Sequence, residues 1–456
     1  MASFLDRAST IAPPGYNRFL VPPAALAVHL SIGQVYAFST FKVPLTHLIG
    51  ITHSAPGDWD QKTVGWTFSI AIAILGLSAA LFGRWVERVG PRRSMFVAAL
   101  CFGGGFIVAA IGIHYHWLWL LYLGYGVLGG CGLGIGYISP VSTLIKWFPD
   151  RPGMATGMAI MGFGGGALIG APLSVILMNH FKSPASAGVL ESFVTMGVLY
   201  FLFMLIGVYA ARVPAPDWKP DSARARRLET PRPLITRANV EVDVAWRTRQ
   251  FWLLWGVLCM NVTAGIGVLG QASPMIQEIF GSNRVSAEAA AGFVGLLSLF
   301  NMGGRFVWAS ASDYIGRRNT YFVFFGLGMV LYFAIPQLGH LASTIPFVIA
   351  FGIILSMYGG GFATIPAYLR DIFGTMHVGA IHGRLLTAWS VAGVLGPVLV
   401  DYIRAYQIEH GVPKAQAYTV TMYIMCALLL VGLLCNLAMR PVDERFHFRA
   451  PAGAGA

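Results

Sequence analysis

Long apolar runs constrain this chain more than any other feature of its sequence. Apolar runs of roughly 18–25 residues can cross a bilayer as α-helices, and the chain contains twelve stretches of this kind. Each stretch must satisfy its own backbone hydrogen bonds in lipid, so we expect helices and not strands. The predicted fold class is therefore an all-α polytopic membrane protein. We place the twelve helices at 20–46, 63–83, 94–112, 117–145, 154–179, 191–211, 250–276, 290–311, 320–337, 344–368, 380–402 and 417–438.

The charged residues fit a membrane protein in number and in position. They make up only 11% of the chain, whereas a soluble domain carries about 25%. The net charge of +12 could suggest a nucleic-acid partner, but its distribution follows the positive-inside rule. With both termini in the cytoplasm, 24 of the 31 Lys and Arg residues fall inside. We therefore predict cytoplasmic termini, a multi-pass protein of the inner (plasma) membrane and no nucleic-acid partner. The remaining seven are Lys42, Lys62, Lys182, Arg284, Arg404 and Lys414 outside, and Arg305 within a span.

The segment 212–249 interrupts the series of apolar runs. It is polar, rich in proline and basic, a composition that does not predict a folded domain. We interpret it as a cytoplasmic linker between two six-helix halves, 1–211 and 250–440, with a cytoplasmic tail at 441–456. Because the linker is the longest soluble segment, the sequence does not favour a sensor with an appended soluble domain.

No motif in the sequence predicts a metal, a cofactor or an enzyme. The five cysteines lie in apolar runs without the spacing of a metal site or a disulfide, and the histidines are scattered. The glycine-rich runs GGCGLGIGY (129–137) and GFGGGALIG (162–170) follow no strand and lack an adjacent Gly-Lys-Ser/Thr, so they do not indicate a phosphate-binding loop. We expect them to serve close helix packing.

A short motif occurs once in each half, in the loop between the second and third helix. The two copies are GRWVERVGPRR and ASASDYIGRR, and a constant shift of 226 residues relates them. An acid near a helix end can bind basic residues and neighbouring helix N-termini. We interpret the motifs as gating latches, Glu87 with Arg92 and Asp313 with Arg318, that part when the halves rock, with a solvated charge cluster as the alternative. The shift pairs Glu87, Gly90 and Arg92 with Asp313, Gly316 and Arg318.

Two parallel six-helix repeats with this loop resemble the major facilitator superfamily across nearly the whole chain. Glu87 and Ala309 are mild departures from the loop signature of that family. The resemblance implies a secondary transporter that works by alternating access. Its substrate site is expected between the halves, near the membrane midplane.

Arg305 is the ionisable residue that the sequence places deepest in a span. Lys42, Arg384 and Asp401 lie near span ends, where long side chains reach headgroups or water. Arg305 lies about six residues inside the eighth helix, roughly 9 Å along its axis, and no Asp or Glu falls near the middle of a span. An ionisable residue at this depth is a functional hypothesis. We expect it to bind a transported anion, and an arginine satisfied by carbonyls or headgroups is the alternative.

Three stretches carry a more specific signal: NMGGRFVWASASD, YISPVSTLIKWFPDRPGMATGMAIMGFGGGAL and GGGFATIPAYLRDIFG. They resemble the oxalate:formate antiporter family, which is related to the monocarboxylate porters. The resemblance implies that Arg305 binds carboxylate, and Asn301 lies one turn before it on the same face. Aromatic walls would exclude water from the substrate, although packing is the commoner role for any single aromatic residue. The pocket positions of the family correspond to Gln34, Tyr36, Tyr137, Phe163, Tyr358, Phe362 and Trp389.

Two departures from that family narrow the predicted substrate and coupling. Trp389 stands where the oxalate exchanger has a second cation, a lysine, so we favour monocarboxylates such as formate, lactate or pyruvate and leave oxalate open. Asn301 replaces the acid that proton-coupled monocarboxylate porters often carry one turn before the arginine. His29 could titrate, or it could be a packed, hydrogen-bonded residue. The alternatives are a proton-coupled monocarboxylate symporter and a porter for another small organic anion.

The expected mechanism follows from the single buried charge. An empty carrier would have to occlude an unpaired guanidinium, which low dielectric disfavours by several kcal/mol. Exchange of one carboxylate for another avoids that state. We therefore predict an antiporter of small carboxylate anions that functions in the bilayer as a monomer, with no cofactor.

Overall fold

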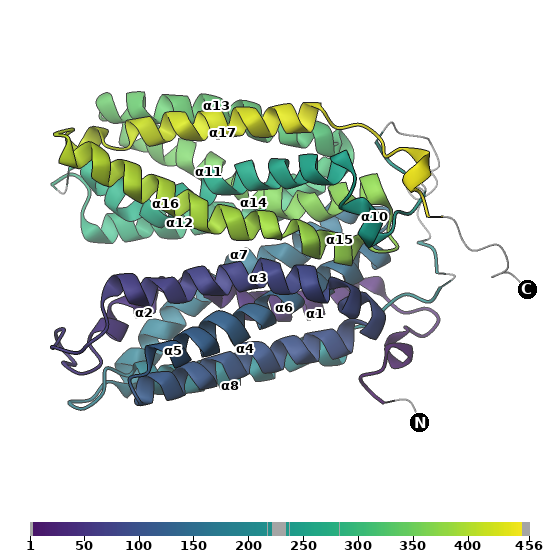
Figure 1. Ribbon diagram of the computed structural model, residues 1–456, viewed down its shortest axis with the longest axis horizontal. Helices are drawn as coiled ribbons and strands as arrows, with labels where there is room; N and C mark the ends of the chain where they lie inside the picture. Colours follow the sequence, from purple (N-terminus) through teal and green to yellow (C-terminus); the bar gives the residue numbers. More distant parts are fainter. Residues whose placement is uncertain (1–2, 217, 221–233, 237, 282, 449–456) are drawn as a thin grey trace, which may run out of the picture.

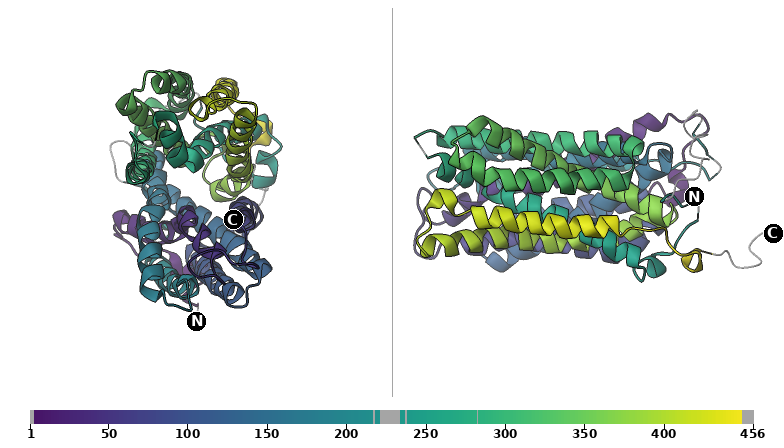
Figure 2. Two further views of the ribbon diagram at one scale, coloured as in Figure 1. Left: turned by 90° about the vertical axis from the view of Figure 1, so that its left-hand side faces the viewer. Right: turned by 90° about the horizontal axis from the view of Figure 1, so that it is seen from above.

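The computed structural model describes residues 3–216, 218–220, 234–236, 238–281 and 283–448 of the chain. Its long helices lie roughly side by side in two groups, and both termini are at the same end of the bundle (Figures 1 and 2). We call this end the terminal face. The first group contains α1 (Val21–Ile32), α2 (Ser39–Lys42), α3 (Gln61–Val89), α4 (Pro91–His114), α5 (Leu118–Leu121), α6 (Gly129–Trp147), α7 (Pro152–Phe181) and α8 (Val189–Ala210).

The second group follows a short connecting helix, α10 (Val242–Ala245). It contains α11 (Arg249–Phe280), α12 (Ala287–Ile315), α13 (Arg317–His340), α14 (Thr344–Phe373), α15 (Val378–Leu385), α16 (Thr387–Glu409) and α17 (Thr419–Leu437). In Figure 1 the first group is purple to blue and the second is teal to yellow.

The prediction of an all-α membrane protein is confirmed. Eleven helical stretches among the described residues are long and apolar enough to cross a bilayer, and they coincide with eleven of the predicted runs. The remaining run, 290–311, lies in α12, a helix of 29 residues. Isolated bridges are the only β-type pairings among the described residues.

Three of the spans are not continuous α-helices. The first passes from α1 into a 3₁₀ stretch, Gly33–Ala37, and the fourth contains a π-helical stretch, Tyr122–Leu128. The eleventh is interrupted at Leu386, between α15 and α16. Such irregular turns within a span often accompany functional sites. Here the first and eleventh spans both carry residues of the candidate site.

The repeated loop motif forms the same tight turn in both halves. Gly90 alone separates α3 from α4, and Gly316 alone separates α12 from α13. Their φ angles are 83° and 86°, in a region that glycine adopts without the steric penalty of a Cβ. The sequence repeat is therefore a structural repeat as well.

Small residues let α7 pack directly on α12, across the boundary between the two groups. A Cβ added at Gly157 would lie 2.9 Å from the carbonyl oxygen of Arg305, and one at Gly164 would lie 2.8 Å from its Nε. Gly153 lies in the same way against the backbone of Ala309. This is the close packing that the glycine-rich run predicts.

The segment between the two groups is tied to both of them where the structure describes it. The Val213 N–H donates to the Thr10 carbonyl at 2.9 Å, and the Val240 N–H donates to the Phe373 carbonyl at 2.9 Å. The tail joins the same segment, because the Phe448 N–H donates to the Asn239 carbonyl at 2.7 Å. The sequence predicted no structure here, and helix α10 corrects that expectation. Residues 221–233 and 449–456 lie outside the described part of the chain.

Candidate functional site

Arg305 is held in a slot lined by glycines from both groups of helices. Its side chain is 0% exposed. Gly164 on α7 lies against its Nε, and Gly359 on α14 leaves no room for a Cβ beside its Cγ. The alternative in which this arginine reaches headgroups is therefore wrong.

Part of the Arg305 guanidinium has no hydrogen-bond partner among the residues that the structure describes. Nε donates to Asn301 Oδ1 at 3.2 Å, and Nη1 donates to the Ile160 carbonyl at 3.3 Å. Nη2 is buried and makes no hydrogen bond, and no ion pair joins Arg305 to a carboxylate of the described chain. Buried polar groups are nearly always hydrogen-bonded. The free Nη2 therefore indicates a site for an acceptor that the chain does not supply.

Aromatic rings from both groups surround this guanidinium. The Arg305 Cζ lies 5.7 Å from the Phe163 ring centre and 5.4 Å from that of Phe362. The rings contact one another with centroid distances between 4.6 and 5.6 Å in the pairs Tyr36–Phe163, Tyr137–Phe163, Tyr137–Trp389, Phe163–Trp389, Phe362–Trp389 and Tyr358–Phe362. We call these six rings the aromatic cage: Tyr36, Tyr137, Phe163, Tyr358, Phe362 and Trp389.

The cage contains two further unpartnered donors. The Tyr137 hydroxyl and the Trp389 Nε1 are buried and make no hydrogen bond. The Tyr36 and Tyr358 hydroxyls lie 3.5 Å apart and join the two groups of helices. Together with Arg305 Nη2, these groups can donate to the oxygens of a small anion while the ring faces exclude water.

The structure brings together eight of the nine predicted binding residues and separates the ninth. Asn301 bonds Arg305, Phe163 and Phe362 lie against the guanidinium, and each of the other four cage rings contacts one of these two. Gln34 instead donates to Ser174 Oγ at 3.3 Å and accepts from the Tyr200 hydroxyl at 3.1 Å. We therefore correct its assignment to packing between the first, fifth and sixth spans.

The sequence analysis did not identify His382, which lies beside the cage. It is 1% exposed, and its ring centre is 5.8 Å from that of Tyr137. His29 lies on the other side of Tyr137, with ring centres 5.3 Å apart and its Nε2 3.2 Å from the Tyr137 carbonyl oxygen. The signal in the sequence was an ionisable side chain inside the predicted span 380–402.

The gating residues of the first half make contacts different from those expected. Glu87 pairs with Lys146 at 2.5 Å and accepts from Ser142 Oγ at 2.5 Å. Arg92 donates to the backbone carbonyls of Phe4 and Ser9 at 3.2 and 3.1 Å. The prediction of a latch between Glu87 and Arg92 is therefore wrong for this state, because Arg92 secures the N-terminal segment.

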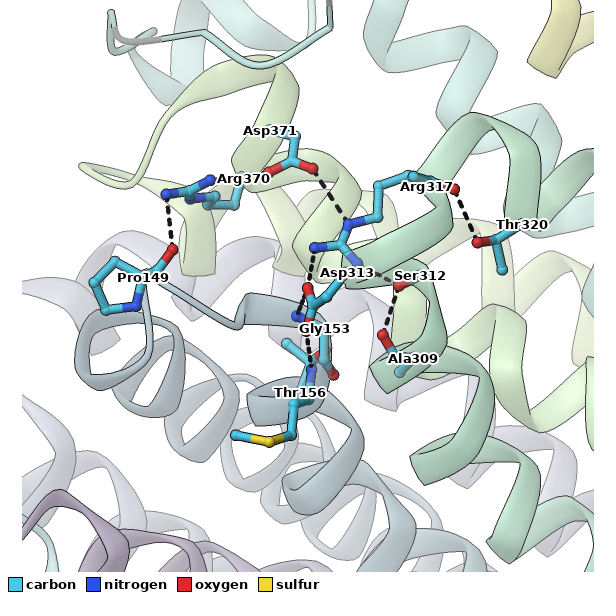
Figure 3. Close-up of polar contacts among 12 residues, drawn as sticks. Pro149, Gly153, Thr156, Ala309, Ser312, Asp313, Arg317, Thr320, Arg370 and Asp371 are labelled. Atoms are coloured by element: carbon cyan, nitrogen blue, oxygen red, sulfur yellow. Dashed lines mark hydrogen bonds and ion pairs between the residues drawn. The ribbon is translucent and has the colours of Figure 1, made fainter. Parts of the chain in front are cut away.

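The second half provides a latch that joins the two groups at the terminal face (Figure 3). Asp313 accepts from the N–H groups of Gly153 and Met154, both at 2.9 Å. These are the first free N–H groups of α7, where a helix favours negative charge. The basic partner of Asp313 is Arg317, at 2.5 Å, and not Arg318, which donates to the Leu437 carbonyl.

Arg317 connects this latch to a second acid. Its Nε lies 3.2 Å from Asp371 Oδ2, and Asp371 also pairs with Arg370 at 3.0 Å. Arg370 in turn donates to the Pro149 carbonyl at 3.3 Å, again across the two groups (Figure 3). Nearer the cage, Thr156 Oγ1 donates to the Ala363 carbonyl at 2.6 Å.

The connecting segment adds an ion pair that the sequence analysis did not predict. Asp243, next to α15, accepts from Arg384 at 2.6 Å and pairs with Arg84 on α3. The hydrogen bond from Arg384 holds the pKa of Asp243 below its usual value, and the charge of Arg84 adds to this effect. At the opposite end of the bundle, no hydrogen bond or ion pair between described residues joins the two groups. The ion pairs that join the two groups of helices in this state therefore lie at the terminal face.

We expect Asp243→Asn to loosen this closure only slightly. Exposed ion pairs contribute about 1 kcal/mol or less, so alkylation of a Thr156→Cys reporter, in a chain freed of its five native cysteines, should speed up by no more than about fivefold. Screening in about 1 M salt should remove the difference. Because the pKa of Asp243 is lowered, the pair persists at neutral pH and is lost only below the ordinary Asp range. The thiolate is the reacting form of a cysteine, so every alkylation rate rises with pH. The ratio of the Asp243→Asn rate to the rate of the parent reporter should therefore be the same throughout about pH 5–8.

The control for this prediction is a double-mutant cycle with Arg84→Gln. The Asp243→Asn effect should largely disappear in the Arg84→Gln background. An undiminished effect there would show that Asp243 acts through Arg384 alone and does not link the two groups.

The described residues hold no cluster of three or more His, Cys, Asp or Glu side chains that could bind a metal ion. A bundle of apolar helices around a buried cation and an aromatic cage is instead the architecture of a multi-pass membrane transporter. The family model of the Major Facilitator Superfamily matches residues 19–397, and the chain belongs to that superfamily.

Relatives within the superfamily narrow the comparison. The chain is similar to the oxalate:formate antiporter of Oxalobacter formigenes, with 26% identity over 390 residues that cover 84% of each chain. It is also similar to monocarboxylate transporter 12 of Mus musculus, with 24% identity over 360 residues that cover 75% of this chain and 72% of that one. The resemblance to both families is therefore confirmed, and these relatives are transporters and not enzymes.

A solved structure shares the fold. A proton:xylose symporter of the same superfamily, bound to 6-bromo-6-deoxy-D-glucose, superposes with a TM-score of 0.66. It is 15% identical, and the match covers 94% of this chain and 95% of that one.

Proposed function

We propose that this protein exchanges small carboxylate anions across the membrane by alternating access, with monocarboxylates of the formate, lactate or pyruvate kind as the favoured cargo. The observation that carries the proposal is the free Nη2 of Arg305, fully buried inside the aromatic cage without a carboxylate partner. The named relatives, an oxalate:formate antiporter and a monocarboxylate transporter, support the same substrate class.

The cage suits a carboxylate by its donors and by the apolar rings around them. The outer nitrogens of a guanidinium can hold two carboxylate oxygens by charge-assisted bonds, and the Tyr137 hydroxyl and Trp389 Nε1 add neutral donors. The rings contact one another directly and keep water from the buried guanidinium of the cage. Arg305 is its one permanent positive charge, which favours a monoanion.

Exchange follows from the electrostatics of the closed centre. With Asn301 and a carbonyl as its only described partners, Arg305 is uncompensated when the cage is empty. An unpaired charge in low dielectric is disfavoured by several kcal/mol, so the loaded protein changes state more easily than the empty one. An anion from one side is then replaced by an anion from the other.

The direction of gating depends on the orientation in the membrane. We infer that the terminal face is cytoplasmic and that the protein lies in the plasma membrane, because the Lys and Arg residues gather on that side. The Asp313 and Asp243 contacts then close the cytoplasmic side in this state. Each half of the site comes from the same chain, which suits a functional monomer.

Counterflow tests the proposal. Purified protein in proteoliposomes should accumulate external labelled formate when the lumen holds unlabelled formate, lactate or pyruvate, because the outward gradient of one anion drives uptake of the other. Proteoliposomes with an empty lumen and proteoliposomes loaded with xylose serve as controls and should show no transient accumulation of labelled formate. A folded protein that exchanges no carboxylate, or that exchanges xylose equally well, would contradict the proposed function.

A further inference from the structure

His382 has no hydrogen-bond partner in the described part of the chain, although it is buried beside the carboxylate site. Both of its ring nitrogens are unpartnered at 1% exposure. A neutral imidazole offers one donor and one acceptor, and a protonated imidazole offers two donors. A buried ring normally satisfies these groups. Since the chain leaves both open, the ring is positioned to interact with a ligand or its proton.

The position of this ring connects it to the cage. It contacts Tyr137, whose unpartnered hydroxyl belongs to the cage. His382 and Trp389 lie on the same interrupted span, on either side of its break at Leu386. His382 is therefore next to the cage on the side of the terminal face, between the cage and the Glu87–Lys146 pair.

Apart from Arg305, the charged groups near His382 are already compensated. On α3, Glu87 lies against Gly379, three residues before His382, and pairs with Lys146 of α6. On α15 itself, Arg384 pairs with Asp243, which precedes α11. The acid of α14, Asp371, is paired with two arginines.

Two titratable rings face His382: Tyr137 from α6 and, beyond it, His29 from α1. The acids of α11 and α16 at the opposite end, Glu278 and Asp401, bond Arg404 and Gln271 respectively. The charge state of His382 is thus free to follow the charge of the cargo.

We propose that His382 is a titratable second cation of the carboxylate site, neutral when a monocarboxylate occupies the cage and protonated when a short dicarboxylate dianion occupies it. This inference rests on the proposed function and specifies its substrate class. It would let a site with one permanent charge accept both kinds of anion.

The charge balance gives the mechanism. Arg305 contributes one positive charge, so a monoanion neutralises the centre while His382 is neutral. A dianion leaves one negative charge, which a proton from the adjoining water removes by binding to an imidazole nitrogen of His382. When the dianion leaves on the other side, that proton returns to water. Unbalanced buried charge is strongly disfavoured, so the dianion and the proton travel together.

Two measurable properties follow. Dianion transport should rise as pH falls, because protonated His382 becomes more abundant, while monoanion transport should not rise with it. Exchange of a dianion plus a proton for a monoanion moves no net charge, so the membrane potential should not drive it. The pKa of Asp243 is lowered, so the carboxylate of Asp243 at the terminal face remains charged at the pH values of the experiment.

The experiment compares labelled oxalate and labelled formate in counterflow at about pH 5.5 and pH 7.5, on either side of the ordinary pKa of an imidazole. In the wild type, the oxalate-to-formate uptake ratio should be higher at the lower pH by roughly tenfold or more. In His382→Gln the ratio should be low and independent of pH. The matched control, His410→Gln, removes an exposed histidine and should behave as the wild type.

Several outcomes would overturn the inference. They are a pH-dependent ratio that survives in His382→Gln, equal loss of both anions in His382→Gln and His382→Asn, wild-type protein that takes formate but no oxalate at either pH, and oxalate–formate exchange driven by an imposed K⁺/valinomycin potential. Thermal unfolding curves show whether the variants are folded. Failure of wild-type protein to exchange any carboxylate would instead reject the proposed function.

Discussion

Arg305→Ala should abolish carboxylate counterflow while leaving the protein folded and in the membrane. The variant removes the one permanent cation of the cage, so the anion would have to enter a low-dielectric centre without a partner. Loss of one member of a buried, hydrogen-bonded charge pair weakens binding by about 2–5 kcal/mol, or roughly 30- to 4,000-fold in affinity. Uptake of labelled formate should therefore fall to the level of empty liposomes.

Two further variants separate charge from folding in this experiment. Arg305→Lys keeps the charge but loses the planar fork and the bonds to Asn301 and Ile160, so we expect weak residual exchange at high formate concentration. Arg284→Ala removes an exposed arginine and should exchange formate as the wild type does. Full counterflow by folded Arg305→Ala would rule out this guanidinium as the anion site.

The sequence was sufficient to predict the parts of the fold that depend on local properties. Length and apolarity of a run decide whether it can cross a bilayer, and the repeated glycines at 90 and 316 marked the equivalent turns. Arg305 was identified for a similar reason, because a charge deep in an apolar run stands out without knowledge of its neighbours.

What the sequence analysis missed depends on the direction in which side chains point. Gln34 and Tyr36 are two residues apart, which places them roughly 240° apart around the axis of their 3₁₀ stretch and about 200° apart in an α-helix, so either kind of helix turns them to different faces. Tyr36 therefore faces the cage, while Gln34 faces Ser174 and Tyr200. The break at Leu386 also changes the direction in which side chains point. The sequence did not show this break, so the contact between His382 and Tyr137 could not be predicted.

The ion pairs were predicted least well because their partners are remote in sequence. Glu87 and Lys146 are 59 residues apart, and Asp313 bonds a backbone N–H 160 residues away. A motif identifies residues that can carry charge at a helix end. The three-dimensional packing decides which helix end or side chain they bind.

The Asp313 latch gives the second large expected effect. Asp313→Asn should favour opening at the terminal face and strongly reduce exchange, because the closed state loses a buried ion pair and the charge that caps α7. Breaking a buried pair by removing one charge is destabilising by about 3–5 kcal/mol, while the amide oxygen of Asn retains some of the hydrogen bonding. We expect the Thr156→Cys reporter to be alkylated at least about tenfold faster, with a matching loss of formate counterflow.

The matched control is Asp443→Asn, which removes the same charge from an exposed pair with Arg445. It should change neither the alkylation rate of the reporter nor formate counterflow. Asp313 and Asp243 differ in burial, at 3% against 43% side-chain exposure, which is why the expected effects differ. If Asp313→Asn leaves the reporter as slow as in the wild type, the contact between Asp313 and α7 does not hold the terminal face closed. The closure would then depend on the glycine packing between α7 and α12, where Gly157→Ala places a methyl group 2.9 Å from the Arg305 carbonyl oxygen and should by itself speed alkylation.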